Sequence, residues 1–142
     1  MKISETTLLV LGNMAKLSQH LVIDAGSKIR SINEHGTSFV EFDGDETYPV
    51  QIALHDLSGF LKVVSLFDDP DFEFKDKFVK ISDEFATQTY YYSDPEELIF
   101  NNDEPEIVDY EIKFDLPESK FSRTLKAAMV NGVEDIGFVG RD

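Results

Sequence analysis

The sequence predicts an α+β fold in which helices pack on antiparallel sheets. Two segments carry apolar side chains at the three- and four-residue spacing of amphipathic helices, with the polar residues on the other side. Short segments of alternating apolar and polar residues lie between and after these two helices, and Gly- and Asp-containing turns separate them. Short strands spaced about ten residues apart are typical of an antiparallel sheet.

The first helix is expected over residues 4–17. Ser4 can cap its N-terminus, because a serine oxygen accepts a hydrogen bond from a free N–H of the first turn. Strands follow, and Asp43-Gly44-Asp45 is expected to form one of the turns between them. The apolar face of the helix consists of Leu8, Leu11, Met14 and Ala15. The expected strands are 21–23, 28–32, 38–42, 50–54, 71–75, 78–82, 87–92, 110–115 and 136–139.

The second helix is expected over residues 56–67, with Asp56 as its N-cap. Its polar face is small and carries a single positive charge at Lys62, so a phosphate backbone could approach it closely. Because the apolar stripes of the first two helices match, we expect these helices to lie side by side on one face of the sheet. The stripe of the second helix consists of Leu57, Phe60, Leu61 and Val64.

The third helix is expected over residues 117–130, and it follows an acidic connector over residues 96–109. After the connector the chain repeats the strand-and-helix pattern of its beginning, which indicates a second structural copy that is cut short. The apolar face of this helix consists of Phe121, Leu125, Ala128 and Met129, and the opposite face carries Lys120, Arg123 and Lys126.

Charge is distributed unevenly along the 142 residues, whose net charge is −15. Residues 1–67 have a net charge of −3, residues 68–115 of −12 and residues 116–142 of zero. The protein can therefore have a surface region that is much less acidic than its net charge suggests. The chain has no cysteine, no apolar run long enough for a membrane span and no signal-peptide pattern at its start. These features favour a cytoplasmic protein.

No catalytic, cofactor-binding or metal-binding pattern is found. The three histidines share no spacing, and there is no phosphate-binding loop or serine-nucleophile motif. Asp69, Asp71 and Glu73 have the alternate spacing of a calcium loop. However, Phe74 stands where that loop needs glycine, and Lys80 stands where it needs a bidentate glutamate. We therefore predict no metal site and no catalytic residue.

The most informative residues are cations on the polar faces of the three helices. If the helices line one side of a curved sheet, these cations line a concave surface in an otherwise acidic protein. Such a surface binds duplex DNA through its phosphates without reading the sequence. The expected DNA-facing residues are Lys16, Lys62, Lys120, Arg123 and Lys126.

Four stretches of the sequence match a known family. They are Met1-Lys2-Ile3-Ser4 with the Leu-rich helix after it, His55-Asp56-Leu57-Ser58-Gly59-Phe60-Leu61 with Val64-Ser65-Leu66, Tyr90-Tyr91-Tyr92-Ser93-Asp94-Pro95 and, more weakly, 122–130 with Asp135-Ile136. On these stretches the chain resembles the DNA polymerase sliding clamps of T4-like phages, most closely those of cyanophage type. The resemblance implies the DNA-clamp fold, with a first clamp domain at 1–95, the connector at 96–109 and an incomplete second domain at 110–142.

The resemblance also implies a function. Members of the family are processivity factors: three subunits form a ring around duplex DNA, an ATP-driven clamp loader opens it, and the polymerase docks through a C-terminal peptide. The clamp catalyses nothing and needs no cofactor. We expect Leu98, Ile99 and Phe100 to help form or cover the peptide groove, because they are large apolar residues in an acidic connector. Anchoring of the connector to the first domain is the alternative role for them.

Two questions stay open at this stage. Full-length members of the family are longer, so the chain is either a gene fragment or a naturally short clamp that assembles differently. The competing functional class is an acidic, non-enzymatic interaction module such as a DNA mimic or inhibitor, which the net charge of −15 would suit. A divalent-metal hydrolase is a third class, and only unpatterned carboxylates favour it.

Overall fold

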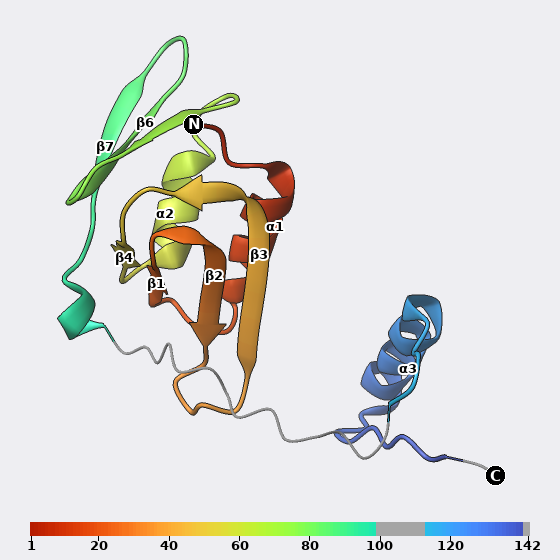
Figure 1. The fold of residues 1–142 in the computed structure, drawn as a ribbon. Coiled ribbons are helices and arrows are strands. Elements are labelled where there is room, and N and C mark those ends of the chain that lie inside the picture. The colour runs from red at the N-terminus through yellow and green to blue at the C-terminus, as the bar shows by residue number, and fades with distance from the viewer. Residues whose placement is uncertain (99–112, 141–142) are drawn as a thin grey trace. The chain divides into compact units, whose positions relative to one another are not determined.

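The computed structural model describes residues 1–98 and 113–140, which fall into two compact units (Figure 1). The first unit contains two helices, seven strands and a short 3-10 helix, and the described part of the second contains one helix. The helices are α1 (Glu5–Met14), α2 (Leu57–Val64), η1 (Pro95–Glu97) and α3 (Glu118–Asn131). The strands are β1 (Leu21–Ile23), β2 (Gly26–Ile32), β3 (Phe39–Tyr48), β4 (Ile52–Leu54), β5 (Asp71–Phe74), β6 (Phe78–Ser82) and β7 (Thr87–Tyr91).

All strand pairs among the described residues are antiparallel, so the predicted α+β class with antiparallel sheets is confirmed. The ladders are β1–β4, β2–β3 and β5–β6–β7. Leu21 faces Leu54 across the first ladder, and Phe72 faces Ile81 across the third. The start of the chain lies along β5, because the Phe72 N–H donates to the Met1 carbonyl at 2.8 Å and the Met1 ammonium donates to the Phe72 carbonyl at 2.7 Å.

Helices α1 and α2 contact each other and share one apolar core with the strands. The contact between α1 and α2 confirms that the two helices lie side by side, and Figure 1 shows α1 passing behind β3. The predicted caps are also present. The Ser4 hydroxyl accepts from the Thr7 N–H at 3.2 Å, and the Asp56 carboxylate accepts from the Gly59 N–H at 2.7 Å. Helix residues buried in this core are Leu11, Met14, Leu57, Phe60 and Val64.

The predicted turn at Asp43-Gly44-Asp45 is wrong, because β3 continues through it to Tyr48. Alternation of exposed and inward-facing residues persists along this part of the strand, with Asp43 and Asp45 exposed and Glu46 buried between exposed neighbours. Pairing with β2 reaches Asp43 and resumes at Tyr48 after a register shift, and the Ser27 hydroxyl donates to the Asp43 carboxylate. Between these two paired positions, the Glu46 carboxylate accepts from the Ser4 N–H and the Thr7 hydroxyl. Tertiary contacts on both sides of Gly44 and Asp45 therefore override the local preference of Asp and Gly for turns.

In the second unit, the predicted helix is confirmed as α3, and the left-handed Gly132 ends it with a φ of 64°. The expected strand at 136–139 is wrong, and so is the described part (113–115) of the strand at 110–115. An extended segment becomes a strand only when a second segment satisfies its backbone hydrogen bonds. Among residues 113–140 no segment does so.

Candidate nucleic-acid interface

Two of the predicted DNA-facing lysines lie on the exposed surface of the α1–α2 pair. Lys16 lies in the turn after α1, and its ammonium donates to the Asn13 side chain at 3.1 Å. Lys62 lies in the last turn of α2, and its ammonium has no hydrogen-bond or ion-pair partner among the described residues. Both lysines are exposed, and the helices that precede and contain them contact each other.

The segment after α1 fixes the position of α2. The Gln19 carbonyl accepts from the Leu57 N–H at 2.9 Å, and the Gln19 side chain accepts from the Ser58 N–H at 3.0 Å. Together with the Asp56 carboxylate, these acceptors satisfy the free N–H groups at the start of α2. The cap also needs Gly59, because a Cβ there would lie 2.3 Å from the Asp56 carboxylate.

A groove of about 570 Å³ runs between α1 and α2, and its floor is largely apolar. Leu8 and Leu61 are among its lining residues. Glu5, Asp68 and Asp69 also line it, so the helix surface is not uniformly positive. The residues that line the groove include these three carboxylates and no lysine, so the groove itself would not attract phosphates.

The third helix carries the other three predicted cations. They lie three residues apart, so they share one side of the helix. All three side chains are exposed, and none has a hydrogen-bond or ion-pair partner among the described residues. We call this set the basic face of α3: Lys120, Arg123 and Lys126.

The predicted peptide groove falls almost entirely outside the described residues. Leu98 is half-buried at the end of η1, where its N–H donates to the Pro95 carbonyl at 3.3 Å. Ile99 and Phe100 are outside the described part of the chain, as is most of the predicted connector at 96–109. The role of these three residues stays a prediction.

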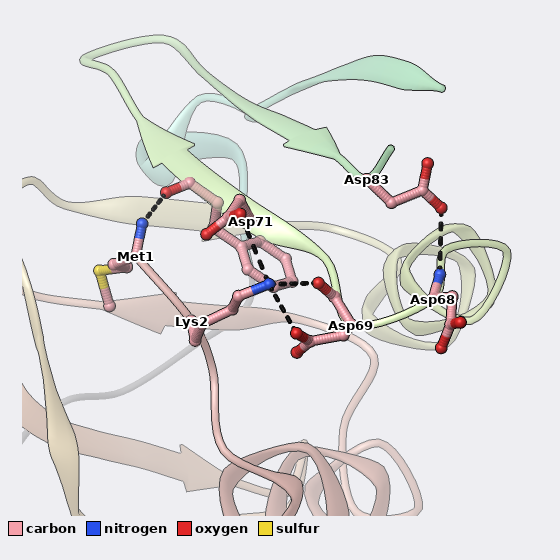
Figure 2. Close-up of polar contacts among 7 residues, drawn as sticks. Met1, Lys2, Asp68, Asp69, Asp71 and Asp83 are labelled. Atoms are coloured by element: carbon pink, nitrogen blue, oxygen red, sulfur yellow. Dashed lines mark hydrogen bonds and ion pairs between the residues drawn. The ribbon is translucent and has the colours of Figure 1, made fainter. Parts of the chain in front are cut away.

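A cluster around Lys2 ties the start of the chain to the loop after α2 (Figure 2). The Lys2 ammonium lies 3.0 Å from the Asp69 carboxylate and 3.4 Å from that of Asp71, and it also donates to the Asp69 carbonyl. The hydrogen bond to Asp69 raises the pKa of Lys2. Asp69 has a left-handed backbone with a φ of 45°. The two carboxylates that suggested half of a calcium loop are therefore in an ion-pair network with Lys2.

Asp83 joins the same loop to the β6–β7 turn. Its carboxylate accepts from the N–H groups of Phe85 at 2.9 Å, Asp68 at 3.1 Å and Ala86 at 2.8 Å. These three hydrogen bonds lower the pKa of Asp83. Residues 1–98 and 113–140 contain no group of His, Asp and Glu side chains arranged to hold a metal ion.

Buried Glu46 is a second feature that the sequence analysis missed. Its carboxylate accepts from the Ser4 N–H at 2.5 Å and from the Thr7 hydroxyl at 2.7 Å, so it fixes the N-terminus of α1 to β3. Burial raises the pKa of Glu46, but the hydrogen bonds from Ser4 and Thr7 outweigh burial and leave the pKa lowered. No sequence signal links these residues, because about forty positions separate them in the chain.

No protein-family model matches the chain, but curated proteins do. It is 32% identical over 143 residues to the sliding clamp of Vibrio phage KVP40, a match covering 96% of this chain and 63% of that protein. The chain is homologous to the sliding clamps of T4-like phages. The sliding clamps of Escherichia phage RB69 and Enterobacteria phage T4 are each 30% identical over 105 residues, which is 72% of this chain and 46% of theirs.

The comparisons confirm the resemblance seen in the sequence, and the antiparallel α+β architecture agrees with the predicted clamp fold. The chain spans between about half and two-thirds of the length of these sliding clamps. Among the described helices, none combines the length and the apolar character needed to cross a membrane.

Proposed function

We propose that this chain acts as a sliding clamp, a processivity factor that encircles duplex DNA and tethers the replicative polymerase. The observation that carries the proposal is the 32% identity to the KVP40 sliding clamp across nearly the whole chain. The α1–α2 pair supports it, because Lys16 and Lys62 are both exposed on these two contacting helices and the turn after α1.

The proposed mechanism is topological, and no residue has a catalytic role. Enclosure of the duplex keeps the polymerase near the primer end between nucleotide additions. Lys16, Lys62 and the basic face of α3 face the DNA and contact phosphates weakly and without reading bases. Strong contacts would slow sliding, so a surface with few cations suits this role. No cofactor is needed.

We propose that residues 1–95 form one clamp domain and that residues 110–142 begin a second one, joined by the connector at 96–109. Copies of the chain assemble around DNA as a homo-oligomer, for which the family's trimeric ring is the expectation. Strand β7 supports assembly, because among the described residues it pairs only with β6 and leaves its other edge free. A free strand edge is a ready site for pairing with another chain.

The proposed partners are duplex DNA, a C-terminal peptide of the DNA polymerase and a clamp-loader ATPase, in the cytoplasm of an infected bacterium. Leu98, Ile99 and Phe100 form or cover the peptide groove. Their apolar side chains in an acidic connector support this assignment.

The test combines light scattering with polymerase processivity on primed circular DNA. A clamp gives an oligomer and longer products per binding event, and the increase requires the clamp loader and ATP. An acidic DNA mimic or inhibitor would instead shorten the products by competing for the polymerase's DNA site. Shorter or unchanged products would contradict the proposed function.

A further inference from the structure

The two faces of the β5–β6–β7 ladder have different surroundings. One face packs into the core: Phe72, Val79 and Ile81 are buried, and the Tyr90 ring of β7 meets the Phe60 ring of α2 at 5.2 Å. Since successive residues of a strand point to opposite faces, the residues between these point away from α2. We call this side the outer face of the ladder, and it consists of Asp71, Glu73, Phe78, Lys80, Ser82, Thr87, Thr89 and Tyr91.

Two aromatic rings lie together on the outer face. Phe78 and Tyr91 are directly opposite each other in the β6–β7 register, and their ring centroids are 5.7 Å apart with the planes tilted by 59°. Phe78 is half-buried, whereas Tyr91 is 70% exposed. The cross-strand contact holds the tyrosine ring in place. An exposed, fixed aromatic ring of this kind is a surface on which a nucleobase can stack.

Lys80 places a positive charge beside the two rings. It lies two residues after Phe78 on β6, so both side chains point outward, and it is exposed. Its ammonium has no hydrogen-bond or ion-pair partner within residues 1–98 and 113–140. Glu73 lies opposite Lys80 in the β5–β6 register, but its carboxylate is 2.6 Å from the Lys75 ammonium. Since Lys75 already compensates that carboxylate, Lys80 can bind an external anion.

The two ends of the ladder differ in charge. At the end near the β6–β7 turn, Lys2 lies among five carboxylates that line a cleft of about 500 Å³ together with Phe85. Phe85 is 91% exposed, but a phosphate would be repelled there. The end near the β5–β6 turn has three lysines and two carboxylates, and we call it the basic end of the ladder: Lys75, Lys77 and Lys80 with Glu73 and Asp76.

This local excess of positive charge contrasts with the rest of the first unit. Residues 1–98 contain eight Lys and Arg against eighteen Asp and Glu. Three of the eight cations therefore lie between residues 75 and 80, next to the exposed Tyr91 ring. Of the two ends of the ladder, only this one combines an exposed aromatic ring with a net positive charge.

We propose that the basic end of the ladder binds single-stranded nucleic acid, with a base stacked on Tyr91 and a neighbouring phosphate on Lys80. Stacking on an aromatic ring and contact of lysines with the backbone are the two ways in which proteins bind single strands without reading sequence. A duplex fits this face less well, because its bases are stacked on one another and a flat sheet cannot reach them. An acidic peptide would use the lysines but gain little from the rings.

The site goes beyond the proposed clamp function and does not compete with it. The cations proposed to contact the duplex belong to α1, α2 and α3, whereas the outer face points away from α2. With one exposed ring and three lysines the site is small, so its affinity for a short oligonucleotide is low. It becomes useful when a single strand is already held near the protein, because the local concentration of the strand is then high.

The experiment is an NMR titration of the full chain at low salt with two ten-nucleotide probes, oligodeoxythymidylate and oligouridylate. The amide signals around Phe78, Lys80 and Tyr91 should shift, and the probe that binds more tightly identifies DNA or RNA as the source of the strand. Tyr91→Ala should weaken binding at least about fivefold, because a stacked base is lost. Tyr91→Phe should bind within about twofold of wild type, since the ring face is kept. The matched control is Phe85→Ala, which should bind like wild type.

Lys80→Gln should weaken binding and reduce the slope of log affinity against log salt by about 0.7, the value for one phosphate contact on a single strand. Shifts confined to the helices, or wild-type affinity in Tyr91→Ala, would overturn the proposal. Equal binding of a ten-residue oligoglutamate at this face would also overturn it, because the partner would then be an acidic peptide. Retention on circular duplex DNA is measured separately and should be unchanged in Tyr91→Ala, so failure here is distinguishable from failure of the clamp function.

Discussion

Replacement of Glu46 tests the link between α1 and β3 most sharply. Glu46 is 8% exposed, and its carboxylate accepts from two donors, the Ser4 N–H at 2.5 Å and the Thr7 hydroxyl at 2.7 Å. Glu46→Ala leaves both donors without an acceptor in a largely buried site. Since hydrogen bonds to charged groups contribute about 1.5–3 kcal/mol each, we expect a loss of about 2–4 kcal/mol in the free energy of unfolding.

Glu46→Gln should be milder, with a loss of about 1–2 kcal/mol, because one amide oxygen can still accept and the amide N–H₂ can donate to the Thr7 hydroxyl oxygen. The pKa of Glu46 is lowered in the folded protein from an ordinary value of 4.5. The ionised carboxylate therefore stabilises the fold above that value, and this contribution is lost as the pH falls below it. The stability difference between wild type and Glu46→Gln should shrink over the same pH range.

The assay is urea unfolding followed by circular dichroism, at neutral pH and at a series of acidic pH values. Asp45→Asn is the control, because Asp45 is an exposed carboxylate on the same strand. It should change the free energy of unfolding by less than about 0.5 kcal/mol. The reasoning fails if Glu46→Ala unfolds at the wild-type urea concentration, or if the Glu46→Gln difference does not depend on pH.

Three further predictions follow from the helices and the connector. Changing the basic face of α3 to alanine should reduce the slope of log DNA affinity against log salt by up to about three per subunit, without changing sequence preference; an unchanged slope would remove these residues from the interface. Gly59→Ala should lower the free energy of unfolding by about 1–2 kcal/mol in urea, because its Cβ would collide with the Asp56 cap. Gly12→Ala should raise the free energy of unfolding by about 0.5–1 kcal/mol, because no atom lies within 4 Å of its Cβ and alanine favours the helix. Leu98→Ala with Phe100→Ala should weaken binding of a polymerase C-terminal peptide in a titration, and wild-type affinity would favour the anchoring role.

Much of the first unit could be predicted from local patterns. The Ser4 and Asp56 caps and the apolar stripes of α1 and α2 are short-range features, and the structure contains all of them. The predicted turn at Asp43-Gly44-Asp45 is wrong because long-range contacts determine the backbone on both sides of it: Asp43 pairs with Lys28 of β2, and the Glu46 carboxylate accepts hydrogen bonds from Ser4 and Thr7. The local preferences of Asp and Gly do not include these contacts. The strand expected at 136–139 failed for a related reason, because its alternation says nothing about whether a partner is present.

Some features of the candidate site could likewise be predicted from local sequence patterns, and others could not. Exposure of Lys16 and Lys62 follows from helical spacing, since packing of the apolar sides of α1 and α2 leaves these cations outward. The basic face of α3 is exposed as predicted, but no residue of that helix is buried among the described residues. The Glu46 link and the Lys2 cluster depend on contacts between residues far apart in the chain, which only the folded structure reveals. Contact between these cations and DNA remains a prediction.

The most direct test of the central claim, enclosure of duplex DNA, is retention of the protein on circular DNA before and after the circle is cut. The protein is loaded on nicked circular DNA by its clamp loader with ATP, free protein is removed, and bound protein is measured at high salt. A topological link predicts stable retention on the circle and rapid loss once a restriction enzyme linearises it. Equal loss from circular and linear DNA, or retention that disappears with salt on both, would contradict the account.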